Sequence, residues 1–164
     1  MVFEQMNESE LQIRTASQKD IDALNRVVEA AVKTWNLPER VKRLALPSYR
    51  YNEHDFEHYE IVVAESGNQL VGVAAWDTVA QPGPEQTRLL FLHGLYVLPE
   101  QQRSGIGSRL LAAAEMAVRK HGFDGIVVKV QKGAEAFFKA QGLGKLGVSN
   151  QARDYENQYW KRLA

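Results

Sequence analysis

The chain contains no cysteine among its 164 residues. A disulfide, a thiolate metal site and a thiol nucleophile are therefore excluded, together with the enzyme classes that depend on them. The absence of cysteine also leaves no indication of an oxidising compartment.

The chain also has no formal net charge at pH 7, because 20 basic side chains balance 20 acidic ones. No global field favours nucleic acid or an anionic membrane surface, so we expect neither partner, and an anionic ligand needs a local site. No run approaches the ~20 apolar residues of a membrane span, and the N-terminus lacks the pattern of a signal peptide. These features predict a soluble, cytoplasmic, single-domain protein over residues 1–164, with a flexible extension at 1–10.

Hydrophobic periodicity switches repeatedly between the strand and helix patterns. Residues 89–98 are nearly all apolar, which is typical of a central strand buried on both faces. Pro47 is expected to stop a helix before it. The expected elements are a strand at 11–16, helices at 21–32 and 39–46, a hairpin at 60–65 and 70–76, a strand at 89–98, a helix at 105–120, a strand at 123–130, a helix at 134–141, and two final strands after 143.

A glycine-containing turn, PEQQRSGIG at 99–107, joins the apolar strand to the amphipathic helix. The unpaired N–H groups and the dipole of a helix N-terminus favour an anion. Gly105 and Gly107 let the backbone approach a phosphate, and Arg103 offers a charge. The turn predicts a pyrophosphate site, although glycines also serve tight packing, and the dinucleotide and P-loop patterns are absent.

Residues 102–107 (QRSGIG) resemble the acyl-CoA-binding motif Q/R-x-x-G-x-G/A of the GNAT N-acetyltransferase superfamily, and residues 13–20, 67–72 and 136–143 resemble other parts of that family. The resemblance implies transfer of an acetyl group from acetyl-CoA to a primary amine of a small molecule or protein. It also implies an α/β (α+β) fold with a mixed, mostly antiparallel sheet of about six or seven strands and about four helices. The fourth and fifth strands should splay apart.

The resemblance also assigns contacts with acyl-CoA, and it implies no metal. Gln131 stands where many relatives have an asparagine that bonds the pantetheine arm, and Phe138 stands where many have a tyrosine that protonates the departing thiolate. Gly94 suits a β-bulge that opens the sheet, or a close helix contact. The assigned positions are Leu95, Tyr96, Val97, Gln102, Arg103, Ser104, Gly105, Ile106, Gly107, Ser108, Gln131 and Phe138.

An alkylamine with a pKa of ~10.4 is protonated at neutral pH, so transfer needs a base. His93 is the candidate, because residues 92–97 are similar to the stretch of arylalkylamine N-acetyltransferases in which a strand histidine takes part in deprotonation. A hydrogen-bonded core histidine is the alternative reading. The backbone N–H of Leu95 could stabilise the oxyanion. Tyr96, Tyr155 or Tyr159 could replace the acid missing at Phe138.

Three further readings stay open at this point. Residues 54–58 (HDFEH) match the H-x-x-E-H zinc pattern, but the segment runs straight into a strand, so we expect no metal there. A regulatory module that binds acyl-CoA without efficient catalysis is the alternative function, and a homodimer is possible. The aromatic residues that either wall the acceptor pocket or cover the sheet are Trp35, Tyr49, Tyr51, Phe56 and Tyr59.

Overall fold

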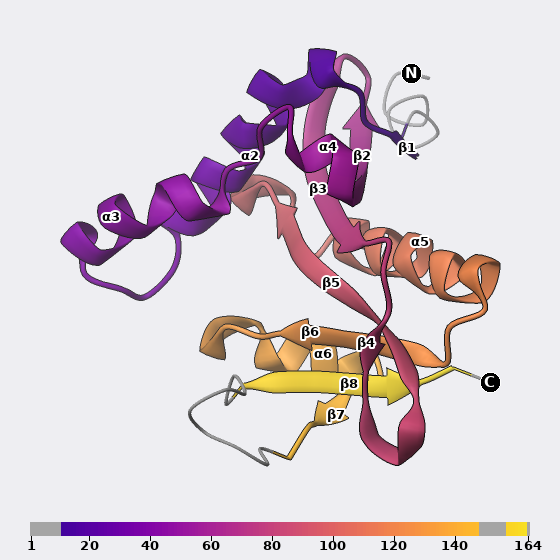
Figure 1. The fold of residues 1–164 in the computed structure, drawn as a ribbon. Coiled ribbons are helices and arrows are strands. Elements are labelled where there is room, and N and C mark those ends of the chain that lie inside the picture. Colours follow the sequence, from indigo (N-terminus) through magenta and orange to yellow (C-terminus); the bar gives the residue numbers. More distant parts are fainter. Residues whose placement is uncertain (1–10, 148–156, 164) are drawn as a thin grey trace, which may run out of the picture.

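One sheet runs through the whole of the described chain. The computed structural model describes residues 11–147 and 157–163. Its eight-stranded sheet has the order β1-β2-β3-β5-β6-β8-β7, with β4 paired to β5 beside that path (Figure 1). Every strand pair within these residues is antiparallel except β5 with β6. The fold is therefore α/β with a mixed, mostly antiparallel sheet, as the family resemblance implies.

The strands and helices follow the predicted order. The strands are β1 Gln12–Thr15, β2 Tyr59–Ser66, β3 Gln69–Asp77, β4 Gln81–Pro82, β5 Arg88–Val97, β6 Gly125–Lys129, β7 Gly144–Lys145 and β8 Gln158–Arg162. The α-helices are α2 Ile21–Lys33, α3 Glu39–Tyr49, α4 Asp55–His58, α5 Ile106–His121 and α6 Glu135–Ala140. The 3-10 helices are η1 Gln18–Asp20, η2 Pro84–Gln86, η3 Pro99–Gln101 and η4 Lys132–Ala134.

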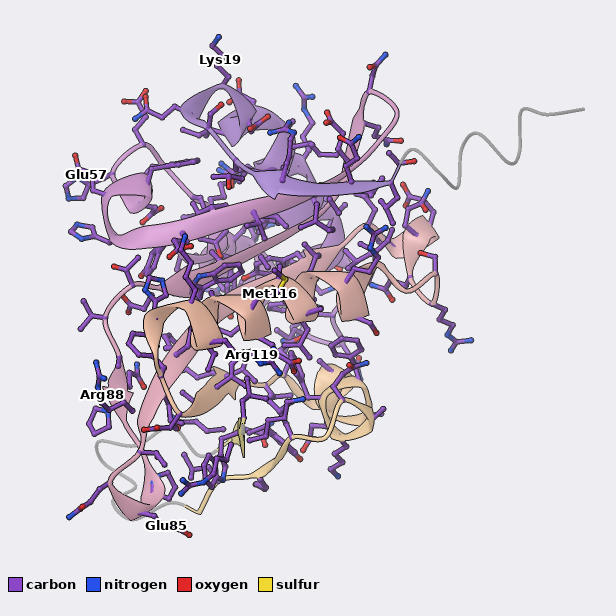
Figure 2. The ribbon with its side chains drawn as sticks, turned by 90° about the vertical axis from the view of Figure 1, so that its right-hand side faces the viewer. Lys19, Glu57, Glu85, Arg88, Met116 and Arg119 are labelled. Atoms are coloured by element: carbon purple, nitrogen blue, oxygen red, sulfur yellow. The ribbon has the colours of Figure 1, made fainter. Side chains whose placement is uncertain are left out.

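Helices α2 and α5 cover opposite faces of the central strands β3 and β5 (Figure 1). Close packing of α5 depends on Gly72 in β3, because a Cβ there would lie 2.9 Å from Leu110 Cδ1. The outer face of α5 meets solvent: Met116 is 68% exposed and Arg119 points outward beside it (Figure 2). The apolar stripe of each helix thus lies on the sheet, where its burial stabilises the fold.

Strands β5 and β6 separate partway along their length. β5 pairs with β6 in parallel only from Leu89 to Leu92, opposite Gly125 to Val128. Beyond Leu92, β5 continues beside β3 as far as Val97, while its other edge has no strand partner within the described residues. The splay implied by the family resemblance is therefore present.

A β-bulge marks the point of separation. Ala75 pairs with Gly94 and Trp76 pairs with Leu92, so His93 is an extra residue in β5. Such an extra residue bends the strand and increases its twist. Gly94 has no room for a side chain, because a Cβ there would lie 2.6 Å from the Tyr51 hydroxyl oxygen and 2.6 Å from Tyr96 Cε2. The bulge predicted for this glycine is present, and the alternative of a close helix contact is not, because the near atoms belong to Tyr51 and Tyr96.

Pro47 lies inside α3, so the prediction that it stops the helix is wrong. Its ring removes the N–H that would bond to the carbonyl of Arg43. None of the side chains of α3 is buried, and an exposed carbonyl can bond to water instead. The Arg50 N–H still reaches the Leu46 carbonyl at 3.3 Å and closes the last turn.

The described structure has more strands and α-helices than expected, because it contains short elements such as β4 and α4. No strand is expected between residues 76 and 89, but β4 lies there and pairs with β5. The additional helix, α4, is a single turn. The proposed flexible extension at 1–10 and the candidate Tyr155 lie outside the described residues. Within the described part of the chain, no helix has the length and apolar character needed to cross a membrane.

A charged network joins β1 to the start of α2. The Asp20 carboxylate accepts hydrogen bonds from Arg14 Nη1 and Nη2, each at 3.0 Å, and from the Ser17 N–H at 2.8 Å. Arg14 Nε also donates to Glu65 of β2 at 3.1 Å. The carboxylate therefore satisfies a free N–H at the helix start and ties the helix to the sheet.

We expect Asp20→Ala to lower the free energy of unfolding by about 1–2 kcal/mol, because it removes the bonds to Arg14 and Ser17. Arg14 holds the pKa of Asp20 below its usual value of 3.8. The contribution of Asp20 is therefore complete above about pH 3.8 and is lost as the pH falls through the lowered pKa. Urea unfolding at about pH 7 and about pH 3 measures this, with exposed Asp22→Ala as a control. A deficit that stays constant between the two pH values would contradict this account.

Candidate active site

The separated strands border a large cleft of about 1400 Å³. Its walls come from the end of α2, the second half of β5, the turn before α5, the end of β6 and the start of α6. Arg103 and Lys145 bring positive charge to it, and no acidic side chain lines it among the described residues. The cleft is therefore suited to a ligand that is part anionic and part apolar.

The N-terminus of α5 opens into this cleft. Gly105 is its N-cap with φ of 86°, in the left-handed region that favours glycine. A Cβ on Gly105 would meet no atom within 4 Å, so the space in front of the turn is open. Arg103 also has a positive φ of 68°, a conformation that costs a non-glycine residue about 1 kcal/mol or more. The turn is thus shaped to leave free N–H groups facing open space.

Most of the predicted acyl-CoA positions meet in the cleft. The exceptions are Ser104, whose hydroxyl donates to the Gln101 carbonyl instead, and Ile106, which is buried against Gly72 in the core. The predicted positions that line the cleft are Leu95, Tyr96, Val97, Gln102, Arg103, Gly105, Gly107, Ser108, Gln131 and Phe138.

Two aromatic residues, one from the bend after α2 and one from α3, pack beside Tyr96. Trp35 lines the cleft and stacks on Tyr96 with ring centroids 6.5 Å apart. Tyr49 packs edge-on against Trp35 at 5.0 Å. Burial raises the pKa of Tyr96, so its hydroxyl stays protonated at neutral pH. Of the predicted aromatic set, Phe56 packs against the core.

The cleft residues that the sequence does not predict include two that distant segments bring there. Lys145 belongs to the two-residue strand β7, which reaches the cleft through pairing with β8. Asn157 lies beside the end of β6, where its Nδ2 donates to the Val130 carbonyl at 2.5 Å. No local sequence signal indicates either contact, since both depend on how β8 adds to the sheet.

His93 lies at the bulge and does not line the cleft. Its Nδ1 is 3.2 Å from the Tyr51 hydroxyl, and its ring lies 4.5 Å from that of Tyr59. Burial lowers the pKa of His93, while the carboxylates of Asp55 and Asp77 oppose this shift. His93 is thus largely neutral at pH 7, as a proton acceptor must be.

The other candidate proton donors are accounted for by their surroundings. Tyr159 donates its hydroxyl to Glu135 Oε2 at 2.6 Å, so its proton is already engaged. Phe138 is 5% exposed and lines the cleft without any ionisable group. Tyr96 is the one predicted catalytic tyrosine that the described structure places in the cleft.

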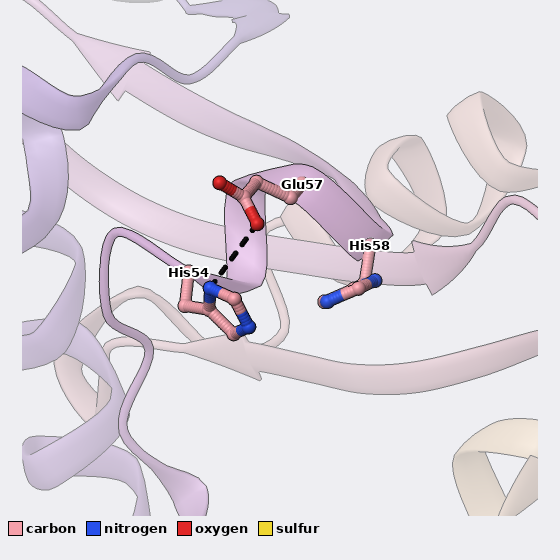
Figure 3. A group of neighbouring side chains, drawn as sticks. All are labelled: His54, Glu57 and His58. Atoms are coloured by element: carbon pink, nitrogen blue, oxygen red, sulfur yellow. Dashed lines mark ion pairs between the residues drawn. The ribbon is translucent and has the colours of Figure 1, made fainter.

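The H-x-x-E-H segment forms an exposed cluster on α4. The ligand atoms of His54, Glu57 and His58 lie within 4.8 Å of one another, and His54 Nδ1 is 3.1 Å from Glu57 Oε2 (Figure 3). However, α4 is a single turn that leads directly into β2. The long helix of the inverted zinc-peptidase pattern is not formed here, and the match does not mark a peptidase centre.

The opened sheet and the glycine turn at its cleft define the fold of an acetyltransferase. The chain belongs to the acetyltransferase (GNAT) family, whose model matches residues 25–143. No curated protein sequence matches the chain.

Solved structures share this fold at low sequence identity. The PaiA N-acetyltransferase from Thermoplasma acidophilum, in complex with coenzyme A, is 18% identical with a TM-score of 0.76, over 93% of this chain and 99% of that one. A GNAT family acetyltransferase from Brucella melitensis, in complex with acetyl-CoA, is 18% identical with a TM-score of 0.65, over 94% and 88%. A mutant AtaT toxin, bound to the C-terminus of the antitoxin AtaR and acetyl-CoA, is 20% identical with a TM-score of 0.64, over 93% of each chain.

We expect Gly94→Ala to destabilise the protein by about 1–3 kcal/mol, because the new Cβ overlaps the Tyr51 hydroxyl and the Tyr96 ring in a packed region. Gly144→Ala is the matched control, since a Cβ there meets no atom within 4 Å. Denaturant midpoints of the two variants measure the difference. Equal stability of both variants would show that the bulge has spare room.

Proposed function

We propose that the protein is an N-acetyltransferase that carries the acetyl group of acetyl-CoA to a primary amine, on a small molecule or a protein. The observation that carries this proposal is the cleft between β5 and β6 with the N-terminus of α5 at its wall. Two features of that cleft, unpaired strand backbone and free helix N–H groups, match the two chemically different parts of a coenzyme A molecule. We propose the chain as a single domain with this role.

The pyrophosphate of acetyl-CoA would bind at the turn before α5. The N–H groups of the first helical turn donate to anions, and the helix dipole adds to the attraction. Arg103 and Lys145 line the same cleft and supply the positive charge. Gly107 borders it without a side chain, and a Cβ there would lie 3.2 Å from the Phe137 ring.

The pantetheine arm would lie along the open edge of β5. Residues 93–97 have no partner on the β6 side within the described sheet, so their N–H and C=O groups can bond to the amides of the arm. Gln131 lines the opposite wall and offers a further amide. This arrangement would bring the thioester close to the bulge.

Attack of a neutral amine on the thioester carbon creates an oxyanion, which the N–H of Leu95 would stabilise. The amine must also lose a proton, and we assign its acceptance to His93, which is neutral and lies at the bulge. Phe138 has no proton for the departing thiolate. A thiol with a pKa of ~8.5 can leave without a dedicated tyrosine at that position, although more slowly.

The acyl-CoA-binding regulatory module remains the second candidate function, and Phe138 favours it. In that case the cleft would bind acetyl-CoA while no amine would be turned over. The two functions share one binding site and differ only in the proton chemistry, so binding and turnover have to be measured separately.

Calorimetric titration with acetyl-CoA tests the binding site. We expect one molecule of acetyl-CoA to bind per chain. Gly107→Val should weaken the affinity by about tenfold or more, because its branched side chain would project into the cleft beside the Phe137 ring. The control is Ala112→Val, which places the same side chain at an exposed position of α5 outside the cleft. A wild-type protein that does not bind acetyl-CoA would overturn both candidate functions.

Turnover of His93→Ala tests the enzyme against the regulatory module. Thiol release is followed with a panel of amines, and we expect kcat to fall by about 10²–10⁴-fold, the usual contribution of a general base. Binding of acetyl-CoA should be retained, since His93 does not line the cleft. Binding by the wild type with no turnover of any amine would identify the regulatory module, and full activity of the variant would remove His93 from the mechanism.

A further inference from the structure

A clasp formed by one side chain fixes the position of Tyr51. Asn25, on α2, donates from Nδ2 to the Tyr51 carbonyl at 2.8 Å and accepts at Oδ1 from the Tyr51 N–H at 2.9 Å. Both ends of the amide are therefore used on the backbone of a single residue. Two hydrogen bonds from one planar group fix the orientation as well as the distance of that backbone.

The Tyr51 side chain then reaches under the bulge of β5. Tyr51 is 3% exposed, and its hydroxyl occupies the space left by the missing Cβ of Gly94. His93 Nδ1, 3.2 Å away, is the hydrogen-bond partner of this hydroxyl within the described residues. Asn25 comes from α2, Tyr51 from the segment before α4 and His93 from β5. The hydrogen bond at His93 Nδ1 therefore links the sheet to the segments that cover it.

Which of the two groups donates in the hydrogen bond between the Tyr51 hydroxyl and His93 Nδ1 depends on where the protons are. Burial raises the pKa of Tyr51 well above its usual value, so the phenol keeps its proton. A buried hydroxyl needs an acceptor for that proton. A neutral imidazole has one N–H and one lone pair. If Nδ1 carried the N–H of His93, the hydroxyl proton of Tyr51 would have no acceptor at this contact.

We propose that Tyr51, held by Asn25, is a positioning residue that donates a hydrogen bond to His93 Nδ1 and keeps the neutral ring in its Nε2–H form. The tautomer of a histidine is set by the hydrogen bond at its other nitrogen, and here that bond is built into the fold. In this form Nε2 carries the proton of the neutral ring and Nδ1 carries its lone pair.

Burial outweighs the carboxylates that face His93 and favours the neutral ring. Asp55 of α4 and Asp77 of β3 raise its pKa, Lys129 of β6 lowers it, and burial has the largest effect and also lowers it. The Tyr59 ring from β2 covers one side of the imidazole. Near neutral pH the ring therefore carries one proton, and the tautomer decides which of its two nitrogens holds it.

The catalytic meaning of this tautomer rests on the proposed function. In the Nε2–H form the lone pair of the ring is at Nδ1, beside the Tyr51 hydroxyl. As the amine attacks and the C–N bond forms, the proton that the amine loses would pass to Nδ1, and the Tyr51 hydroxyl would then accept the Nδ1–H bond. The imidazolium formed in this way still carries the Nε2 proton. When the C–S bond breaks and its electron pair passes to sulfur, the thiolate would take that proton, so one proton has moved from nitrogen to sulfur and His93 is neutral again. His93 would thus supply the proton that Phe138 lacks.

Nitrogen NMR of the protein labelled with ¹⁵N-histidine tests the tautomer directly. The chain has four histidines, and the signals of His93 are those lost in His93→Gln. At about pH 7.5, where His93 is neutral, we expect a protonated Nε2 and an unprotonated Nδ1. A wild-type spectrum with the proton on Nδ1 would overturn the proposal without any further variant.

Two tyrosine variants separate the hydroxyl from the ring. Tyr51→Phe keeps the buried ring and removes the donor, so we expect both tautomers of His93 to become populated. Tyr59→Phe keeps the ring contact at 4.5 Å and should leave the wild-type tautomer unchanged. A Tyr51→Phe spectrum identical to that of the wild type would overturn the role of Tyr51. These spectra need no acetyl-CoA, so a failure of the acetyl-transfer proposal would not be mistaken for a failure of this one.

Discussion

The extra residue in β5 is the constraint on which the site depends. At Leu92 the strand is paired with both β3 and β6, and beyond His93 it keeps β3 and loses β6. The bend frees one edge of backbone and opens the sheet beside the N-terminus of α5. Because Gly94 leaves room below the strand, the same bend admits the Tyr51 hydroxyl. The cleft, the turn before α5 and the contact between His93 and Tyr51 thus all depend on one irregularity in strand pairing.

The parts that the sequence predicts well are those set by neighbours along the chain. An apolar run predicts β5, a glycine C-cap at Gly122 predicts the end of α5, and the spacing within residues 102–107 predicts the turn, which has positive φ at Gly105. Each of these depends on local backbone preference or periodicity. The predicted cofactor positions meet in the cleft for the same reason, since most of them belong to this strand and this turn.

The parts that the sequence does not predict depend on contacts between distant segments. Pro47 continues α3 because that helix is exposed, a condition that its own residues do not reveal. Lys145 enters the cleft only because β8 adds to β6 and carries β7 with it. The position of His93 outside the cleft lining follows from the bulge, whose register is a property of the pairing with β3. Hydrophobic periodicity along a single segment does not predict any of these contacts, because each depends on another part of the chain.

The two hydrogen bonds between Asn25 and Tyr51 make the position of Tyr51 independent of α3, the helix that precedes it in the chain. They anchor the backbone just after α3, while α3 itself buries no side chain and carries exposed apolar residues such as Leu44. Residues 38–48 can therefore change in length or sequence while Trp35 and Tyr49 keep their contacts beside the cleft and the Tyr51 hydroxyl stays below the bulge, as is usual for surface segments on a rigid frame. In an engineering sense this stretch is an exchangeable module, bounded at one end by the cleft wall and at the other by the Asn25–Tyr51 clasp.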